Sequence, residues 1–138
     1  MKLVIAGIAL SALLATSAPG QNLREYRGEI PFAFHIGSVS YDAGQYRVFR
    51  SSPNNPSGWE IVGTGSVSGL FFAMPSDPGT YDGGHPILRF NCYGRTCFLS
   101  GIRGAETYAV WSLSPSLLER ETARRAASLE ARIVHLTH

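Results

Sequence analysis

Short segments in which apolar and polar residues alternate constrain the fold of this chain more than any other feature. In EIPFAFHIG, residues 29–37, every second residue is large and apolar: Ile30, Phe32, Phe34 and Ile36. A period of two over this length predicts a half-buried β-strand. Pro31 lies within the segment and has no N–H to give to a ladder, so we expect a sheet edge or the start of a strand there.

Similar segments recur along the chain, and 15 glycines and 8 prolines separate them. We expect strands at residues 45–50, 59–63, 69–74 and 106–113, and a two-stranded hairpin within residues 87–104. The sequences SSPNNPSG, residues 51–58, and PSDPGTYDGGHP, residues 75–86, predict loops. The pattern is typical of a mainly β domain, a small antiparallel β-barrel or roll of about six to seven short strands.

The composition changes after Ser114, where alanine, leucine, glutamate and arginine dominate. These are good helix formers, and Ser116 and Glu119 have the spacing of a capping box. We therefore predict a C-terminal helix over about residues 115–131, lying on the surface because its apolar stripe is thin. Residues 133–136 alternate instead, which leaves a short closing strand as an alternative.

The N-terminus has the three parts of a secretory signal peptide. MKLVIAGIALSALLATSAPG, residues 1–20, begins with one positive charge, continues with an apolar run and ends in small residues. The apolar run is too short for a stable membrane span. We therefore expect export to the periplasm or the cell exterior, with residues 21–138 as a single domain that has no membrane span after signal removal.

The charge of the chain argues against one class of partner. The formal net charge is only +2, and charged residues make up 16% of the sequence. A nucleic-acid-binding domain usually carries a strongly basic patch. We therefore expect no nucleic-acid partner.

Both cysteines lie in NCYGRTC, residues 91–97. A two-residue turn at Gly94 and Arg95 would place Cys92 opposite Cys97, and an exported protein favours their oxidation to a disulfide. By alternation the bridge would face the core, and closing so short a loop stabilises by about 2 kcal/mol. A redox pair usually has C-x-x-C spacing, and a zinc site needs two further ligands, so both are weaker interpretations.

The other face of this hairpin is a candidate binding patch. Aromatic and arginine side chains are common in binding surfaces, and Arg95 would lie at the tip of the turn. A neighbouring strand or the C-terminal helix could instead cover this face. Its residues are Arg89, Tyr93, Thr96 and Phe98.

The loop at residues 75–86 is a second candidate, because it gathers Asp77, Asp82 and His85. Polar loops on a rigid scaffold often carry binding sites. A solvated loop with Asx turns is the simpler interpretation, and the ligand pattern of an EF-hand is absent. The sequence also has no G-x-S-x-G motif. We therefore assign no catalytic residue, metal ligand or cofactor.

Three segments together resemble a family of small exported proteins of environmental bacteria. They are IPFAFHIGSVSYDAGQYRVFR, LRFNCYGRTCFLSGIRG and LLERETARRAA. They are similar to the family's IPF-F-G, AG-Y-V and F-x-x-YG-x-x-FL stretches and to its Arg/Glu-rich helical end. The resemblance covers most of the mature chain but implies no activity. Cys92 and Cys97 depart from the family pattern, which implies a bridge added to a hairpin that already folds.

These features predict an exported, non-enzymatic binding or interaction protein. Its partner would be an unknown protein or glycan of the cell envelope. One alternative is an inhibitor of a hydrolase, because small disulfide-braced β domains can insert a loop into an enzyme cleft. A second alternative is a small hydrolase that uses His35 or His85 with Asp77 or Asp82.

Overall fold

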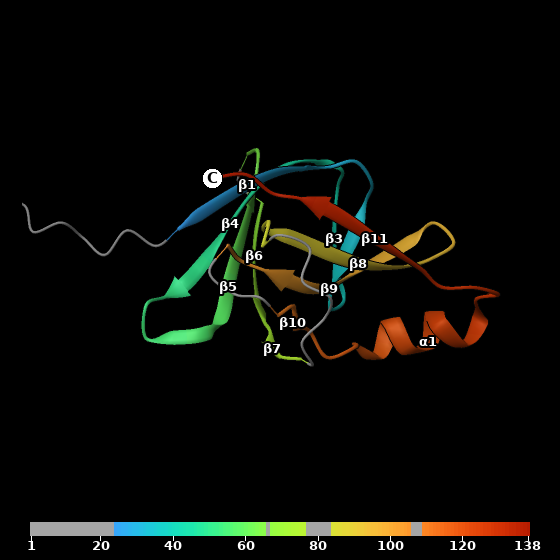
Figure 1. The fold of residues 1–138 in the computed structure, drawn as a ribbon. Coiled ribbons are helices and arrows are strands. Elements are labelled where there is room, and N and C mark those ends of the chain that lie inside the picture. Colours follow the sequence, from blue (N-terminus) through green and yellow to red (C-terminus); the bar gives the residue numbers. More distant parts are fainter. Residues whose placement is uncertain (1–23, 66, 77–83, 106–108) are drawn as a thin grey trace, which may run out of the picture.

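The computed structural model describes residues 24–65, 67–76, 84–105 and 109–138 (Figure 1). The chain is mainly β with a single helix in this part, which confirms the predicted fold class. The predicted signal peptide lies outside the described residues.

The first sheet has four antiparallel strands in the order β1-β4-β5-β6. Residues alternate between its two faces, and the buried face carries the large apolar residues expected from the sequence. Its strands are β1 (Glu25–Ile30), β4 (Gly44–Ser52), β5 (Asn55–Gly63) and β6 (Ser68–Phe72).

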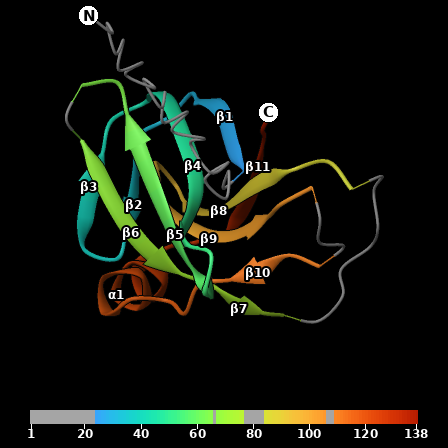
Figure 2. The ribbon, with the colours of Figure 1, turned by 90° about the vertical axis from the view of Figure 1, so that its left-hand side faces the viewer.

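The second sheet follows the order β11-β8-β9-β10-β7 and is also antiparallel along this path. Two short strands extend it: β2 (Phe34–Ile36) pairs in parallel with β9, and β3 (Val39–Tyr41) pairs with β2. Figure 2 shows β4 and β5 running across the direction of β8 and β9. The remaining strands are β7 (Met74–Pro75), β8 (Ile87–Tyr93), β9 (Thr96–Arg103), β10 (Trp111–Ser112) and β11 (Glu130–His135).

The two sheets meet at both sides but do not form a closed barrel. On one side Arg27 and Thr137 exchange two backbone hydrogen bonds of 2.7 and 2.8 Å, as an isolated bridge. On the other side the chain passes directly from β6 through Ala73 to β7, and the N–H of Ala73 extends the pairing of β6 with β5 by donating to the carbonyl of Ser57 at 2.9 Å. The architecture is therefore closer to a roll than to a barrel.

The core between the sheets is rich in aromatic rings. Phe34 is 1% exposed, and its ring centroid lies 5.3 Å from those of Tyr41, Tyr46 and Phe90. Tyr46 belongs to the first sheet and Phe90 to the second. The β2 strand thus inserts Phe34 between the two sheets, as its alternating pattern predicts.

Several details of the predicted strands and loops are wrong. Residues 29–37 do not form one strand, because β1 ends at Ile30, directly before Pro31, and β2 begins at Phe34. Residues 51–58 are not a loop, since Ser52 pairs with Asn55 and the two strands continue almost to the tip of a hairpin. The described residues contain eleven strands, more than expected, because several are only two or three residues long.

The C-terminal helix α1 (Leu117–Arg125) is shorter than the predicted range of residues 115–131. It begins as expected, with the Ser116 hydroxyl accepting a hydrogen bond from the N–H of Glu119 at 3.1 Å. It ends because the backbone becomes extended at Ala126, and β11 then pairs with β8. The alternative of a closing strand is confirmed, although that strand starts earlier, at Glu130.

Candidate functional site

The cysteine hairpin has the predicted geometry. Cys92 and Cys97 are opposite each other in the ladder and form a disulfide. Gly94 has a φ of 64° and Arg95 does not have a positive φ, which fits a type II′ turn with glycine first. The two cysteines are 0% and 1% exposed, so the bridge faces the core as expected. A buried disulfide is typical of proteins in oxidising compartments.

Of the two alternatives for the outer face of this hairpin, an exposed patch or coverage by a neighbouring element, the structure has the second at Phe98. Phe98 is 2% exposed. The ring of His35 stacks on it at 5.1 Å, because β2 lies beside β9 and pairs His35 with Phe98. The ring of Tyr93 contacts it edge-on at 6.0 Å.

Helix α1 covers another part of the same face. The Tyr93 hydroxyl donates to the Glu119 carboxylate at 3.4 Å, and Glu119 is buried. Burial raises the pKa of the Glu119 carboxyl, and the hydrogen bond from Tyr93 opposes this effect. Burial also raises the pKa of the Tyr93 hydroxyl, and the nearby charge of Glu119 adds to the increase. Tyr93 therefore anchors the helix instead of facing solvent freely.

We expect the variant Glu119→Gln to be more stable than the wild type at neutral pH but not at pH 4. The pKa of Glu119 is raised in the folded state, so the contribution of this group to stability is fully present below the unfolded value of 4.5 and is lost as pH rises through the folded value. Glutamine stays neutral and can still accept the Tyr93 hydrogen bond. Thermal unfolding from pH 4 to pH 8 measures the difference, and a variant that is less stable at every pH contradicts this role of Glu119.

Arg89 is also used within the fold. Its guanidinium donates to the hydroxyl of Ser100 at 3.2 Å, to the Ser100 carbonyl at 3.3 Å and to the hydroxyl of Ser112 at 3.0 Å. These bonds connect β8 to β9 and β10. Of the predicted patch, Thr96 is half-buried and Arg95, at the tip, is exposed.

The predicted loop site is only partly described. Asp77 and Asp82 lie outside the described residues. His85 is exposed, and its backbone carbonyl accepts two hydrogen bonds from Arg103, at 3.0 and 2.9 Å.

A serine and a histidine approach each other elsewhere. The Ser40 hydroxyl oxygen lies 3.0 Å from Nε2 of His35. A catalytic pair needs a third group to orient the histidine, and within the described residues the buried Nδ1 of His35 has no hydrogen-bond partner. The ring instead packs flat on Phe98. The His35 ring thus packs β2 against β9.

The sequence prediction missed an exposed apolar row at the end of the first sheet. Leu70, Phe72 and Met74 are 62%, 63% and 60% exposed. They alternate with the buried residues Phe71 and Ala73, so they all point away from the core. They lie on β6, the terminal strand of its sheet, and on β7, and are called the β6–β7 row below. Residues 70–74 are all apolar, so the sequence indicated two apolar faces but not which of them would be exposed.

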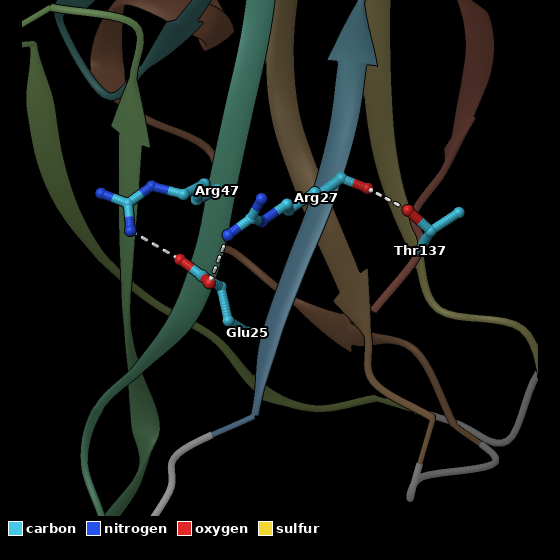
Figure 3. A network of polar contacts seen from close by, with 4 residues as sticks. All are labelled: Glu25, Arg27, Arg47 and Thr137. Atoms are coloured by element: carbon cyan, nitrogen blue, oxygen red, sulfur yellow. Dashed lines mark hydrogen bonds and ion pairs between the residues drawn. The ribbon is translucent and has the colours of Figure 1, made fainter.

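A cavity of about 280 Å³ opens on the same sheet, with charged residues from β1 and β4. Figure 3 shows Glu25 between Arg27 and Arg47. One carboxylate oxygen of Glu25 accepts from Arg47 at 2.7 Å and the other accepts from Arg27 at 3.2 Å. The hydrogen bond from Arg47 is the main cause of a lowered pKa for the Glu25 carboxyl. The lining residues are Arg27, Gln45, Tyr46, Arg47, Val62, Gly63 and Thr64.

The chain matches no protein family model, no curated protein and no solved structure. Among the residues that the structure describes, no helix has the length and apolar character needed to cross a membrane. In the same residues, no group of three or more histidine, cysteine or acidic side chains could hold a metal ion.

Proposed function

We propose that the protein is an exported, non-enzymatic binding protein that docks a polypeptide partner along the β6–β7 row. The observation that carries this proposal is the exposure of three large apolar side chains, Leu70, Phe72 and Met74, in one line. Soluble proteins seldom expose such residues contiguously unless they bind a partner there.

The position of the row favours an extended polypeptide as the partner. β6 ends the first sheet, so the backbone groups along its outer edge can pair with an added strand. Burial of a leucine, phenylalanine or methionine side chain contributes about 1.5–3 kcal/mol. Backbone pairing would thus supply register, while the apolar side chains supply most of the affinity.

Two further features support export and a partner site on the β6–β7 row. The buried disulfide suits an oxidising compartment, as the predicted signal peptide at residues 1–20 requires. Tyr93 and Phe98, two of the candidate binding residues, contact Glu119 and His35 within the fold instead. If the partner is a hydrolase, the protein would be an inhibitor.

We expect the double variant L70E/F72E to fold normally and to lose its partner. Two buried apolar contacts would be replaced by charges, which should weaken binding by about 100-fold or more. Partners captured from envelope extract by the mature wild type would be purified, and their affinities for wild type and variant measured directly. The variant V39E is the control, because Val39 is also exposed but lies on β3.

Two results would contradict the proposal. One is a purified partner that binds wild type and L70E/F72E with equal affinity. The other is a light-scattering measurement that finds the wild type dimeric and L70E/F72E monomeric. In that case the row would bind a second copy of this chain instead of another polypeptide.

A further inference from the structure

The cavity beside Arg27 and Arg47 has a lining with two positive charges and no carboxylate. Glu25 contacts both arginines but does not itself line the cavity. Glu29 on β1 and Glu60 on β5 are also outside the lining. Both charged residues of the lining are therefore positive.

The register of the sheet places the two arginines next to each other. Arg27 on β1 is directly opposite Arg47 on β4. Like charges in this position are unfavourable, by roughly 0.2–1 kcal/mol. Within the described part of the chain, Glu25 is the one carboxylate that contacts these two guanidinium groups, so one negative charge faces two positive ones.

Glu25 also shows which chemistry fits the pair. Each guanidinium takes one oxygen of the same carboxylate (Figure 3). A guanidinium has five N–H donors, and the bond to Glu25 uses only one from each arginine. Donors remain on both arginines for a second oxyanion.

The rest of the lining suits a small polar ligand. Gln45 and Thr64 offer an amide and a hydroxyl, and Val62 offers an apolar contact. Gly63 leaves room for the Tyr46 ring, because a Cβ there would come within 2.9 Å of that ring. A volume of about 280 Å³ lies at the lower end for small-molecule sites, so it fits one small group instead of a polymer.

We propose that this cavity is a binding site for a small carboxylate ligand, held by Arg27 and Arg47 and oriented by Gln45 and Thr64. The site is distinct from the β6–β7 row, and its occupation does not depend on a partner there. An acidic sugar and an acidic amino acid both present the required carboxylate. The test therefore uses one probe of each kind.

The mature protein would be titrated with D-glucuronate, with N-acetylaspartate and with neutral D-glucose, and backbone amide shifts followed by NMR. We expect saturable shifts at Arg47, Val62 and Thr64 with at least one of the acids, at a Kd on the order of millimolar, and none with glucose. The variant R47Q should weaken binding by at least ~10-fold, since it removes a charge-assisted hydrogen bond. The acid that binds shows whether the site accepts an acidic sugar or an acidic amino acid.

Two further variants make the test specific. R124Q makes the same change of charge on the exposed face of α1, away from the cavity, and should leave the affinity unchanged. E25Q removes the competing carboxylate and should tighten binding by about threefold or more. No saturable binding of either acid, an equal loss in R47Q and R124Q, or equal binding of glucose would overturn the proposal.

Discussion

Replacing Phe34 by alanine (F34A) is expected to lower the free energy of unfolding by about 3–5 kcal/mol. Phe34 is 1% exposed and contacts aromatic rings from both sheets, those of Tyr46 and Phe90. Removal of its ring would leave a cavity at the point where the sheets meet. A domain of this size is stable by only about 5–15 kcal/mol, so the loss would be a large fraction of the total.

Urea denaturation of the mature protein measures this change. The matched control is the same substitution at Phe72, which is 63% exposed and should change stability by no more than about 0.5 kcal/mol. If F34A lowers the free energy of unfolding by no more than F72A does, Phe34 does not connect the two sheets. A large loss from F72A would mean that its ring is covered in the isolated protein, which would also contradict the docking surface.

Features that depend on neighbouring residues were predictable from the sequence. The alternation at residues 29–37 identified Phe34 as a core residue, and it is buried. The hairpin at Gly94 and the pairing of Cys92 with Cys97 follow from a two-residue turn, and both are confirmed. Register within a hairpin is fixed by its turn, so no distant part of the chain is needed.

Features that depend on distant segments were not predictable. The burial of Phe98 requires β2 to lie beside β9, and the charge pair of the cavity requires Arg27 to be in register with Arg47. In the same way Arg50 lies over the rings of Trp59 and Trp111, at 5.0 and 5.8 Å, although the two tryptophans are on different sheets. No local pattern indicates such pairings.

Because much of the outer face of the cysteine hairpin is covered, the candidate binding surfaces lie mainly on the first sheet and not on the second. The disulfide occupies the inner face of the cysteine hairpin, while His35 and Glu119 cover much of its outer face. The hairpin is therefore mainly a structural anchor. Leu70 and Phe72 of the β6–β7 row and the arginine-lined cavity belong to the sheet that contains β4 and β6, while Met74 continues the row on β7.

The second large effect is expected where β3 packs against this sheet. Gly69→Ala should lower the free energy of unfolding by about 2–3 kcal/mol, because a Cβ at this position would collide with the Tyr41 hydroxyl. Tyr41 cannot move aside easily, since it is buried and stacks on Phe34 at 5.3 Å. Gly69 therefore keeps the outer edge of the first sheet in its position relative to β3.

A double-mutant cycle separates this collision from the general cost of changing a glycine. The variant Y41F removes the hydroxyl, so G69A should be less damaging in Y41F than in the wild type, with a coupling of about 1 kcal/mol or more. Gly44→Ala is the control, because a Cβ there meets nothing within 4 Å and should leave stability almost unchanged. If G69A lowers the free energy of unfolding by the same amount with and without the Tyr41 hydroxyl, the collision is not the cause. The glycine is then needed for its backbone conformation and not for the space that it leaves. The β6 strand would then owe its position to pairing with β5 alone, and the packing of β3 would not help to hold the proposed docking edge.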